Sequence, residues 1–171
     1  MTQQISIDED ALRFTFHSGI QAVKYDDWVH YRNQFQNKCC TDNKAVDIIA
    51  HNGQITWLCE VKDFRQGRRD PNKPPLEMEI AQKVRDSLAG LVSAQFHANE
   101  QTEQQFAKDV LHCQSICVVL HIEQSTGQKQ QYHLPDLQDK LRKLLKAIDP
   151  HVLVLNKDMP HSKIVWQVAY I

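Results

Sequence analysis

The chain has 171 residues, 42% of them hydrophobic, which is enough for one domain with a buried core. Its 20 basic and 21 acidic residues give a formal net charge of -1, so no overall attraction to nucleic acid or to a membrane is expected. The first residues do not combine a basic region with an apolar run, and no apolar stretch approaches the roughly 20 residues that span a bilayer. The five cysteines are therefore expected to be free thiols in a cytoplasmic protein.

The alternation of β-rich runs with amphipathic segments predicts an α/β fold around one mixed sheet. In chain order, the predicted elements are a strand at 11–17, a helix at 25–35, strands at 45–50 and 55–62, a helix at 76–96 that either continues through 103–112 or is followed by a second helix, a strand at 115–123, a helix at 134–148, and strands at 151–157 and 163–171. No linker divides them, so residues 1–171 are expected to form a single domain.

The segment VDIIAHNGQITWLCEVK (46–62) predicts a β-hairpin with a two-residue turn at Asn52 and Gly53. In that register Asp47 lies opposite Leu58. Because side chains alternate along a strand, Asp47, Glu60 and Lys62 are expected to project from one face of the hairpin. The other face is expected to be entirely apolar and to carry Val46, Ile48, Ala50, Ile55, Trp57, Cys59 and Val61.

Two carboxylates on one face of a hairpin are suited to binding a metal ion. Asp47 and Glu60 are expected as diagonal neighbours, with Cα atoms about 7–8 Å apart. At that spacing they can share a hard cation such as Mg²⁺, whose bonds to oxygen are about 2.0–2.1 Å. A surface salt bridge accounts equally well for Glu60 and Lys62. It does not account for an Asp within an apolar run, because burying an unpaired carboxylate is costly.

An Asp in an apolar strand, a hairpin, and then Glu60-Val61-Lys62 twelve residues later resembles the PD-(D/E)XK nuclease superfamily. The resemblance covers about residues 25–123. It implies a restriction-endonuclease-like mixed sheet flanked by helices, with 124–171 adding a C-terminal helix and strands to the same sheet. Ala45 and Val46 stand where the family has a proline. The family's first core strand is missing from QNKCCTDNK, and the strand at 11–17 is the candidate substitute.

The resemblance implies a metal-dependent endonuclease that hydrolyses phosphodiester bonds of DNA with Mg²⁺ or Mn²⁺. Asp47, Glu60 and the backbone carbonyl of Val61 would hold the metal, which activates a water and neutralises charge on the phosphate. Lys62 would orient or deprotonate that water. Asp27, one turn before Tyr31, is the candidate third carboxylate, with a helix N-cap as its competing role. Its neighbour in the sequence, Asp26, is expected to point away.

Further polar residues near the motif have two open interpretations each. The basic run in the loop at 63–75 either contacts phosphate or is a solvated loop, and it consists of Arg65, Arg68, Arg69 and Lys73. On the following helix, Gln82 and Lys83 resemble polar residues that some family members place near the metal, and ordinary helix surface is the alternative. Gln82 is taken as the possible auxiliary residue.

Two functions remain open from the sequence. The intact set of Asp47, Glu60 and Lys62 favours the nuclease. The near-neutral charge favours a catalytically silent nuclease-fold subunit that binds nucleic acid or a protein partner. The expected partners are DNA and a divalent metal, with either a homodimer or a partner protein and no membrane.

Overall fold

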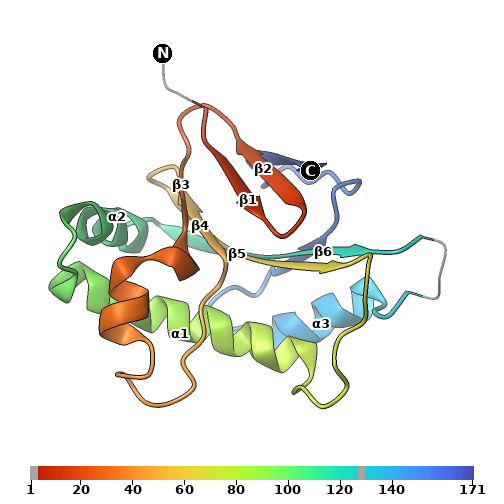
Figure 1. Cartoon of the computed structure of the whole chain (residues 1–171). Helices are drawn as coiled ribbons and strands as arrows, with labels where there is room; N and C mark the ends of the chain where they lie inside the picture. Colours follow the sequence, from red (N-terminus) through yellow and green to blue (C-terminus); the bar gives the residue numbers. More distant parts are fainter. Residues whose placement is uncertain (1–3, 127–129) are drawn as a thin grey trace.

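Two β-sheets and three α-helices form the structure, a computed structural model that describes residues 4–126 and 130–171 (Figure 1). One sheet has five strands in the order β3-β4-β5-β6-β7, and the other has three in the order β1-β2-β8. The strands are β1 (Ser6–Glu9), β2 (Leu12–Phe16), β3 (Gln21–Lys24), β4 (Ile48–His51), β5 (Ile55–Phe64), β6 (Ser115–Gln124), β7 (Leu153–Leu155) and β8 (Trp166–Tyr170). The helices are α1 (Leu76–His97), α2 (Gln101–Leu111) and α3 (Leu134–Leu144), with a short 3-10 helix η1 (Tyr25–Asp27) and a π-helix η2 (Tyr31–Phe35).

The five-stranded sheet is covered on both faces. The helices lie on one face and the three-stranded sheet lies on the other (Figure 1). A sheet buried on both sides reads as a near-continuous apolar run, which is why β6 carries the sequence Ile-Cys-Val-Val-Leu. Strands β5 and β6 pair in parallel, as do β6 and β7, whereas β3, β4 and β5 pair antiparallel. The sheet is therefore mixed, as the sequence predicts.

Helix α1 supplies much of the helical core. Its buried residues Leu76, Ile80 and Val84 recur every four positions and pack with Leu58 of β5 and Leu120 of β6. The spacing that produces this apolar stripe also places Glu79 and Lys83 at its edge, next to the charged side chains of β5. Packing of α1 against the sheet therefore brings polar residues from both elements together.

The chain between β3 and β4 is held by α2. The carboxylate of Glu103 accepts hydrogen bonds from the backbone N–H groups of Val29 (2.8 Å) and His30 (2.9 Å). These amides begin a helical segment and have no partner within it, so a side chain from another helix supplies the cap. This contact fixes the position of the residues that precede η2.

The hairpin register differs from the predicted one. His51 pairs with Thr56 and Ile48 with Cys59, so the turn is two residues longer than a type I′ turn at Asn52 and Gly53. The side chain of Asn52 causes the difference, because its Oδ1 accepts the backbone N–H groups of Gln54 and Ile55. A shift of two residues preserves the alternation of faces.

Four further predictions about the elements need correction. Val46 precedes β4 and packs into the helical core rather than on the face of Ile48. The expected α-helix at 25–35 consists of η1 and η2 with a break at Trp28. Strands β1 and β3 were not predicted. The C-terminal strand β8 pairs with β2 in the second sheet, so residues 124–171 do not all extend one sheet.

A candidate acid–lysine site

Asp47 is held at the edge of the hairpin by contacts from two directions. It lies directly before β4 and is 7% exposed. Its backbone carbonyl accepts the N–H of Tyr25 (2.8 Å), and its Oδ2 accepts the N–H of Val61 (2.7 Å). The carboxylate is therefore fixed against β5, with Oδ1 left facing Lys83.

Glu60 lies at the centre of the charged cluster, in the middle of β5, and is 1% exposed. Its Oε1 accepts from the Nζ of Lys62 and from the Nζ of Lys83, both at 2.6 Å. The same Nζ of Lys83 lies 3.6 Å from Oδ1 of Asp47, so this lysine bridges the two carboxylates. Asp47, Glu60, Lys62 and Lys83 are called the acid–lysine site below.

The electrostatics of the site perturb both Glu60 and Lys83. Burial, and then the nearby charge of Asp47, raise the pKa of Glu60 to about 7. Burial acts to lower the pKa of Lys83, but the carboxylates of Glu60 and Asp47 outweigh it and raise that pKa. Glu60 therefore holds a proton more tightly than an ordinary glutamate does, while Lys83 keeps its charge.

A second ion pair adjoins the site on α1. Glu79 accepts from Nη2 of Arg69 (2.5 Å) and lies 3.6 Å from the Nζ of Lys62. Burial alone would raise the pKa of Glu79, but its hydrogen bond from Arg69 and the charges of Lys62 and Arg69 lower it. Arg69 is thereby committed to an internal contact.

A cavity of about 330 Å³ leads to the acid–lysine site, and its lining includes Asp26, Lys44, Asp47 and Lys83. Burial, and then the charge of Asp47, raise the pKa of Asp26. Its Oδ1 is buried and has no hydrogen-bond partner in the described part of the chain. The cavity therefore joins solvent to a group of carboxylates and lysines.

The structure brings Asp47, Glu60 and Lys62 together, as expected, but it exchanges the roles of Asp26 and Asp27. Asp27 is exposed and pairs with Arg32, so it does not join the cluster. Asp26 lines the cavity instead. An α-helix with 3.6 residues per turn would have placed Asp27 on the inner face, but the 3-10 geometry and the break that follows it change the phase.

Lys83 is the site residue that sequence reasoning passed over in favour of its neighbour. Gln82 turns away and donates to the backbone carbonyl of Asp42 (2.8 Å). Lys83 lies four residues after Glu79, at the margin of the apolar stripe of the helix. This spacing was the feature of the sequence that could have indicated that Lys83 belongs to the site. The interpretation of Gln82 as the auxiliary residue is thus not supported by its contacts.

Two of the four basic residues in the loop after β5 form internal ion pairs, and the other two are exposed to solvent. Arg65 forms a paired contact with Asp63 and lies 3.8 Å over the ring of Tyr170, and Arg69 pairs with Glu79. Arg68 and Lys73 are exposed to solvent. Only these last two could reach an external phosphate without first breaking an internal ion pair.

The fold and the site together define a mixed α/β protein with a buried carboxylate–lysine cluster between a β-hairpin and a helix. The chain is similar to cysteine–tRNA ligase of Neisseria meningitidis serogroup A, with 36% identity over 156 residues. The match covers 74% of this chain and 22% of the ligase, so the chain spans about a fifth of that protein's length. No family model matches the chain, and no solved structure matches it significantly.

The match corrects the function expected from the sequence. The relative is a tRNA ligase, not a nuclease, which contradicts the prediction of a Mg²⁺-dependent DNA endonuclease. A short motif such as Asp47 with Glu60-Val61-Lys62 has few fixed positions, so it is a weaker guide to function than similarity along most of the chain. Within the described residues, no helix is long and apolar enough to cross a membrane.

Proposed function

We propose that this chain is a tRNA-binding module related to part of a cysteine–tRNA ligase. The observation that carries the proposal is the 36% identity to a protein named for its action on tRNA. Because the match covers 22% of the ligase, the proposal is limited to contact with tRNA and does not extend to the ligase reaction.

The acid–lysine site and its rim are the proposed contact surface. Lys44 lines the cavity beside Lys83, and Arg68 and Lys73 are exposed on the loop that precedes α1. Phosphate oxygens are bound mainly by lysine and arginine side chains, which fix a protein on a nucleic acid without selecting its sequence. The cavity supplies a recess, and the loop supplies positively charged side chains outside it.

A divalent cation would make this surface attractive to phosphate. The lysines of the site are matched by the carboxylates of Asp47 and Glu60, so the site has little net positive charge of its own. Two oxygens of the site face no partner other than a lysine: Oε2 of Glu60 is buried without a hydrogen-bond partner among the described residues, and Oδ1 of Asp47 faces Lys83. Among the same residues, no cluster of three or more His, Cys, Asp or Glu side chains could hold a metal ion, so a cation here would take two carboxylates and complete its shell with water or phosphate oxygens. We propose that Asp47 and Glu60 hold Mg²⁺, which supplies positive charge toward a phosphate, while Lys83 is released to contact the same group.

We also infer that the architecture is of the restriction-endonuclease type. The support is the order of helix, hairpin, helix and parallel strand from η1 to β6, with the acid–lysine site between the hairpin and α1. A fold of this kind does not define a function, so a tRNA-binding role is compatible with it.

Equilibrium titration of a fluorescently labelled tRNA with wild-type protein and variants, at one fixed Mg²⁺ concentration, tests the contact surface. Asp47→Asn, which removes a ligand of the proposed cation, and Lys44→Ala, which removes a lysine that lines the cavity, should each weaken binding by about tenfold, the effect of losing one charge-assisted contact. Lys146→Ala changes an exposed lysine that follows α3 and does not line the cavity, so it is the matched control and should bind as wild type does. The fixed Mg²⁺ keeps the tRNA folded throughout, and the recovered RNA is checked for integrity on a denaturing gel. Equal affinity of all four proteins would show that tRNA does not contact the acid–lysine site.

A further inference from the structure

Strand β8 of the three-stranded sheet has an edge with free backbone hydrogen-bonding groups. The sheet order is β1-β2-β8, so β8 pairs with β2 on one side and with no described strand on the other. At the two ends of the β2–β8 ladder, the N–H of His17 donates to the carbonyl of Val165 (2.8 Å), and the N–H of Ile171 donates to the carbonyl of Ala11 (3.1 Å). Because bonded pairs alternate along an antiparallel ladder, the odd-numbered residues of β8 bond to β2. The backbone groups that point along the free edge are those of Trp166, Val168 and Tyr170.

The composition of β8 is unusual for an unpaired edge strand. Such strands commonly carry charges or prolines, or are very short, and these features prevent another chain from pairing with them. The other three edge strands have them: β1 contains Asp8 and Glu9, β3 ends in Lys24, and β7 has three residues. Strand β8 has five residues, WQVAY, with no charge and no proline. Its free edge is therefore suited to pairing with a further strand.

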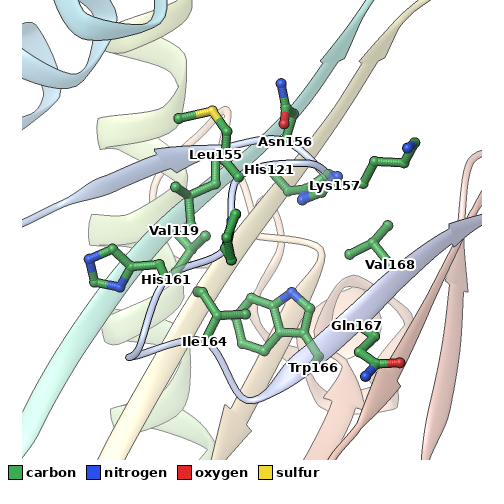
Figure 2. Close-up of a pocket in the computed structure, with 12 residues that line it drawn as sticks. Val119, His121, Leu155, Asn156, Lys157, His161, Ile164, Trp166, Gln167 and Val168 are labelled. Atoms are coloured by element: carbon green, nitrogen blue, oxygen red, sulfur yellow. The ribbon is translucent and has the colours of Figure 1, made fainter.

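A cavity of about 420 Å³ lies beside this edge, on the opposite face of the five-stranded sheet from the acid–lysine site (Figure 2). Trp166 and Val168 line it from β8, and Val119 and Leu155 line it from β6 and β7. The loop that follows β7 supplies most of the remaining lining. The five-stranded sheet thus extends past the edge of β8, and the cavity occupies the space between them.

This space matches one added strand. Neighbouring strands lie about 4.8 Å apart, packed sheets about 10 Å apart, and a strand rises about 3.3 Å per residue, so one strand residue occupies roughly 160 Å³. The cavity therefore has room for about three residues. The apolar side chains available to an inward-facing side chain include those of Val168, Ile164 and Met159, of which Met159 is 41% exposed.

We propose that the free edge of β8 binds an extended peptide segment of another protein as an antiparallel fourth strand of the three-stranded sheet. The backbone groups of β8 supply the hydrogen bonds, and the cavity selects the side chains. Every second side chain of the segment points into the cavity, so the segment is apolar at alternate positions. Antiparallel pairing continues the order of β1, β2 and β8, and it is slightly more stable per residue than parallel pairing.

Charge also restricts the segment. None of the described lining residues is acidic, and Figure 2 shows His161 and Lys157 at opposite ends of the cavity. The N–H of Lys163 donates to Nδ1 of His161 (3.2 Å), which places the ring proton on Nε2 and makes that nitrogen a donor. Lys157 pairs with the exposed Asp158, a weak contact that a carboxylate of the segment can replace. An acidic residue at each end of the segment would find a partner, whereas a basic residue would not.

A second copy of this chain is a poorer occupant than a single segment. Antiparallel pairing of β8 with β8 of a second copy would relate the two by a two-fold axis perpendicular to the sheet, which leaves both five-stranded sheets on the same side. Each five-stranded sheet extends past the edge of β8, because β6 and β7 line the cavity. The two sheets would then occupy the same space, and a segment with no sheet beneath it avoids this overlap.

Calorimetric titration of the whole chain with synthetic peptides tests the proposal. The probe is the end-capped heptapeptide Glu-Val-Thr-Val-Thr-Val-Glu, whose valines face the cavity in the proposed pairing. In an antiparallel pair, residues on the same face as Val168 and opposite its bonding groups direct their own N–H groups to β8. N-methylation of the three valines should therefore weaken binding by at least about tenfold, whereas N-methylation of the two threonines should leave it unchanged.

A proline on each edge of the sheet provides the matched pair of protein variants. Val168→Pro removes an N–H of the free edge and no bond to β2, and it should weaken binding of the probe by at least about tenfold. The N–H of Phe16 donates to the carbonyl of Ile5 (2.9 Å), so the N–H of Ser6 points away from β2 at the other edge. Ser6→Pro should therefore bind the probe as wild type does. Melting temperatures of both variants confirm that they are folded.

Three results would overturn the proposal: no binding of the probe up to about 1 mM, equal binding of the two N-methylated peptides, or wild-type affinity in Val168→Pro. Sedimentation of the chain alone should show a monomer, and a dimer that Val168→Pro dissociates would assign the edge to a second copy instead. Asp47→Asn should leave peptide affinity unchanged even if it abolishes tRNA binding, because the two sites share no lining residue. Failure of this proposal is therefore distinguishable from failure of the proposed tRNA contact.

Discussion

Glu60 makes the stability of the protein depend on pH. Its pKa is raised from an ordinary value of 4.5 to about 7, so the native protein binds this proton more tightly than the unfolded chain does. Protonation therefore stabilises the fold, and the free energy of unfolding falls as pH rises from about 4.5 to about 7. The contribution is at most about 3.5 kcal/mol, from about 1.4 kcal/mol per pKa unit.

Glu60→Gln should flatten this dependence. The amide cannot ionise, so the variant should lose less stability than wild type between pH 4.5 and pH 7. Urea unfolding at a series of pH values measures the effect. Asp26 also has a raised pKa, so some slope of the same sign should remain in the variant. Parallel pH profiles for wild type and Glu60→Gln would show that Glu60 titrates normally.

His51 has the opposite effect on stability. It is 7% exposed, its two ring nitrogens have no hydrogen-bond partner in the described structure, and its ring meets the edge of Phe106. Burial lowers its pKa, despite the opposing charge of Asp109, so the native state binds the proton more weakly than the unfolded chain. Stability should therefore be lost as pH falls below about 6.5, the ordinary pKa of histidine.

His51→Leu should stabilise the protein, most strongly in acid. It removes a buried polar group whose missing hydrogen bonds cost about 1–3 kcal/mol. The melting temperature measured at pH 5 and pH 8 checks the expectation. His17→Leu, at an exposed position, is the control and should change little. A lower melting temperature for His51→Leu at both pH values would mean that the ring makes a contact worth more than its burial costs.

At the scale of elements, the packing of α1 against η1 depends on a helix glycine. A Cβ added at Gly90 would lie 2.2 Å from the hydroxyl oxygen of Tyr25, which is buried and donates to the carbonyl of Ser87 (3.4 Å). Alanine is the better helix former by about 1 kcal/mol. The overlap should outweigh that gain, because overpacking a buried contact costs about 1–3 kcal/mol.

Gly90→Ala should therefore destabilise the protein, and Tyr25→Phe should rescue it by removing the hydroxyl. The free energies of unfolding of both single variants and the double variant form a double-mutant cycle, and a favourable coupling is expected. Additive effects of the two substitutions would show that α1 and η1 move apart to accommodate the methyl group.

The hairpin shows how much of the site the sequence could predict. Its turn is two residues longer than predicted, because the Asn52 side chain closes the turn through its own oxygen. The shared face of Asp47 and Glu60 survived, because an error of two residues keeps side-chain parity. At η1 the backbone is a short 3-10 helix and not a regular α-helix, so the same reasoning failed and chose Asp27 instead of Asp26.

At the scale of the whole molecule, the division into two sheets could not be predicted from local sequence patterns. Strands β1 and β2 form a local hairpin, but β8 comes from the other end of the chain, and its pairing with β2 joins residues more than 140 positions apart, such as Phe16 and Trp166. Alternation along a strand indicates which face is apolar but not which apolar face it meets. The cavity beside Trp166 arises from this packing, so the sequence alone gave no indication of it.

A cation held by Asp47 and Glu60 should stabilise the whole protein. Anything that binds the native state and not the unfolded chain raises its stability by mass action. Mg²⁺ should raise the melting temperature of wild type, and more at pH 8 than at pH 5.5, because protons compete for Glu60 below its pKa of about 7. Asp47→Asn should remove most of the shift. An equal shift in the variant would place the cation elsewhere.

The central claim is that this chain binds tRNA, and one competition titration tests it most directly. Wild-type protein is bound to a labelled tRNA, and unlabelled tRNA or a DNA duplex of equal phosphate number is added at fixed salt and Mg²⁺, because phosphate contacts depend strongly on salt. We predict that tRNA displaces the label at a concentration at least about tenfold lower than DNA, a difference of about 1.4 kcal/mol. Displacement by DNA as readily as by tRNA, or no saturable binding of the labelled tRNA, would contradict the account.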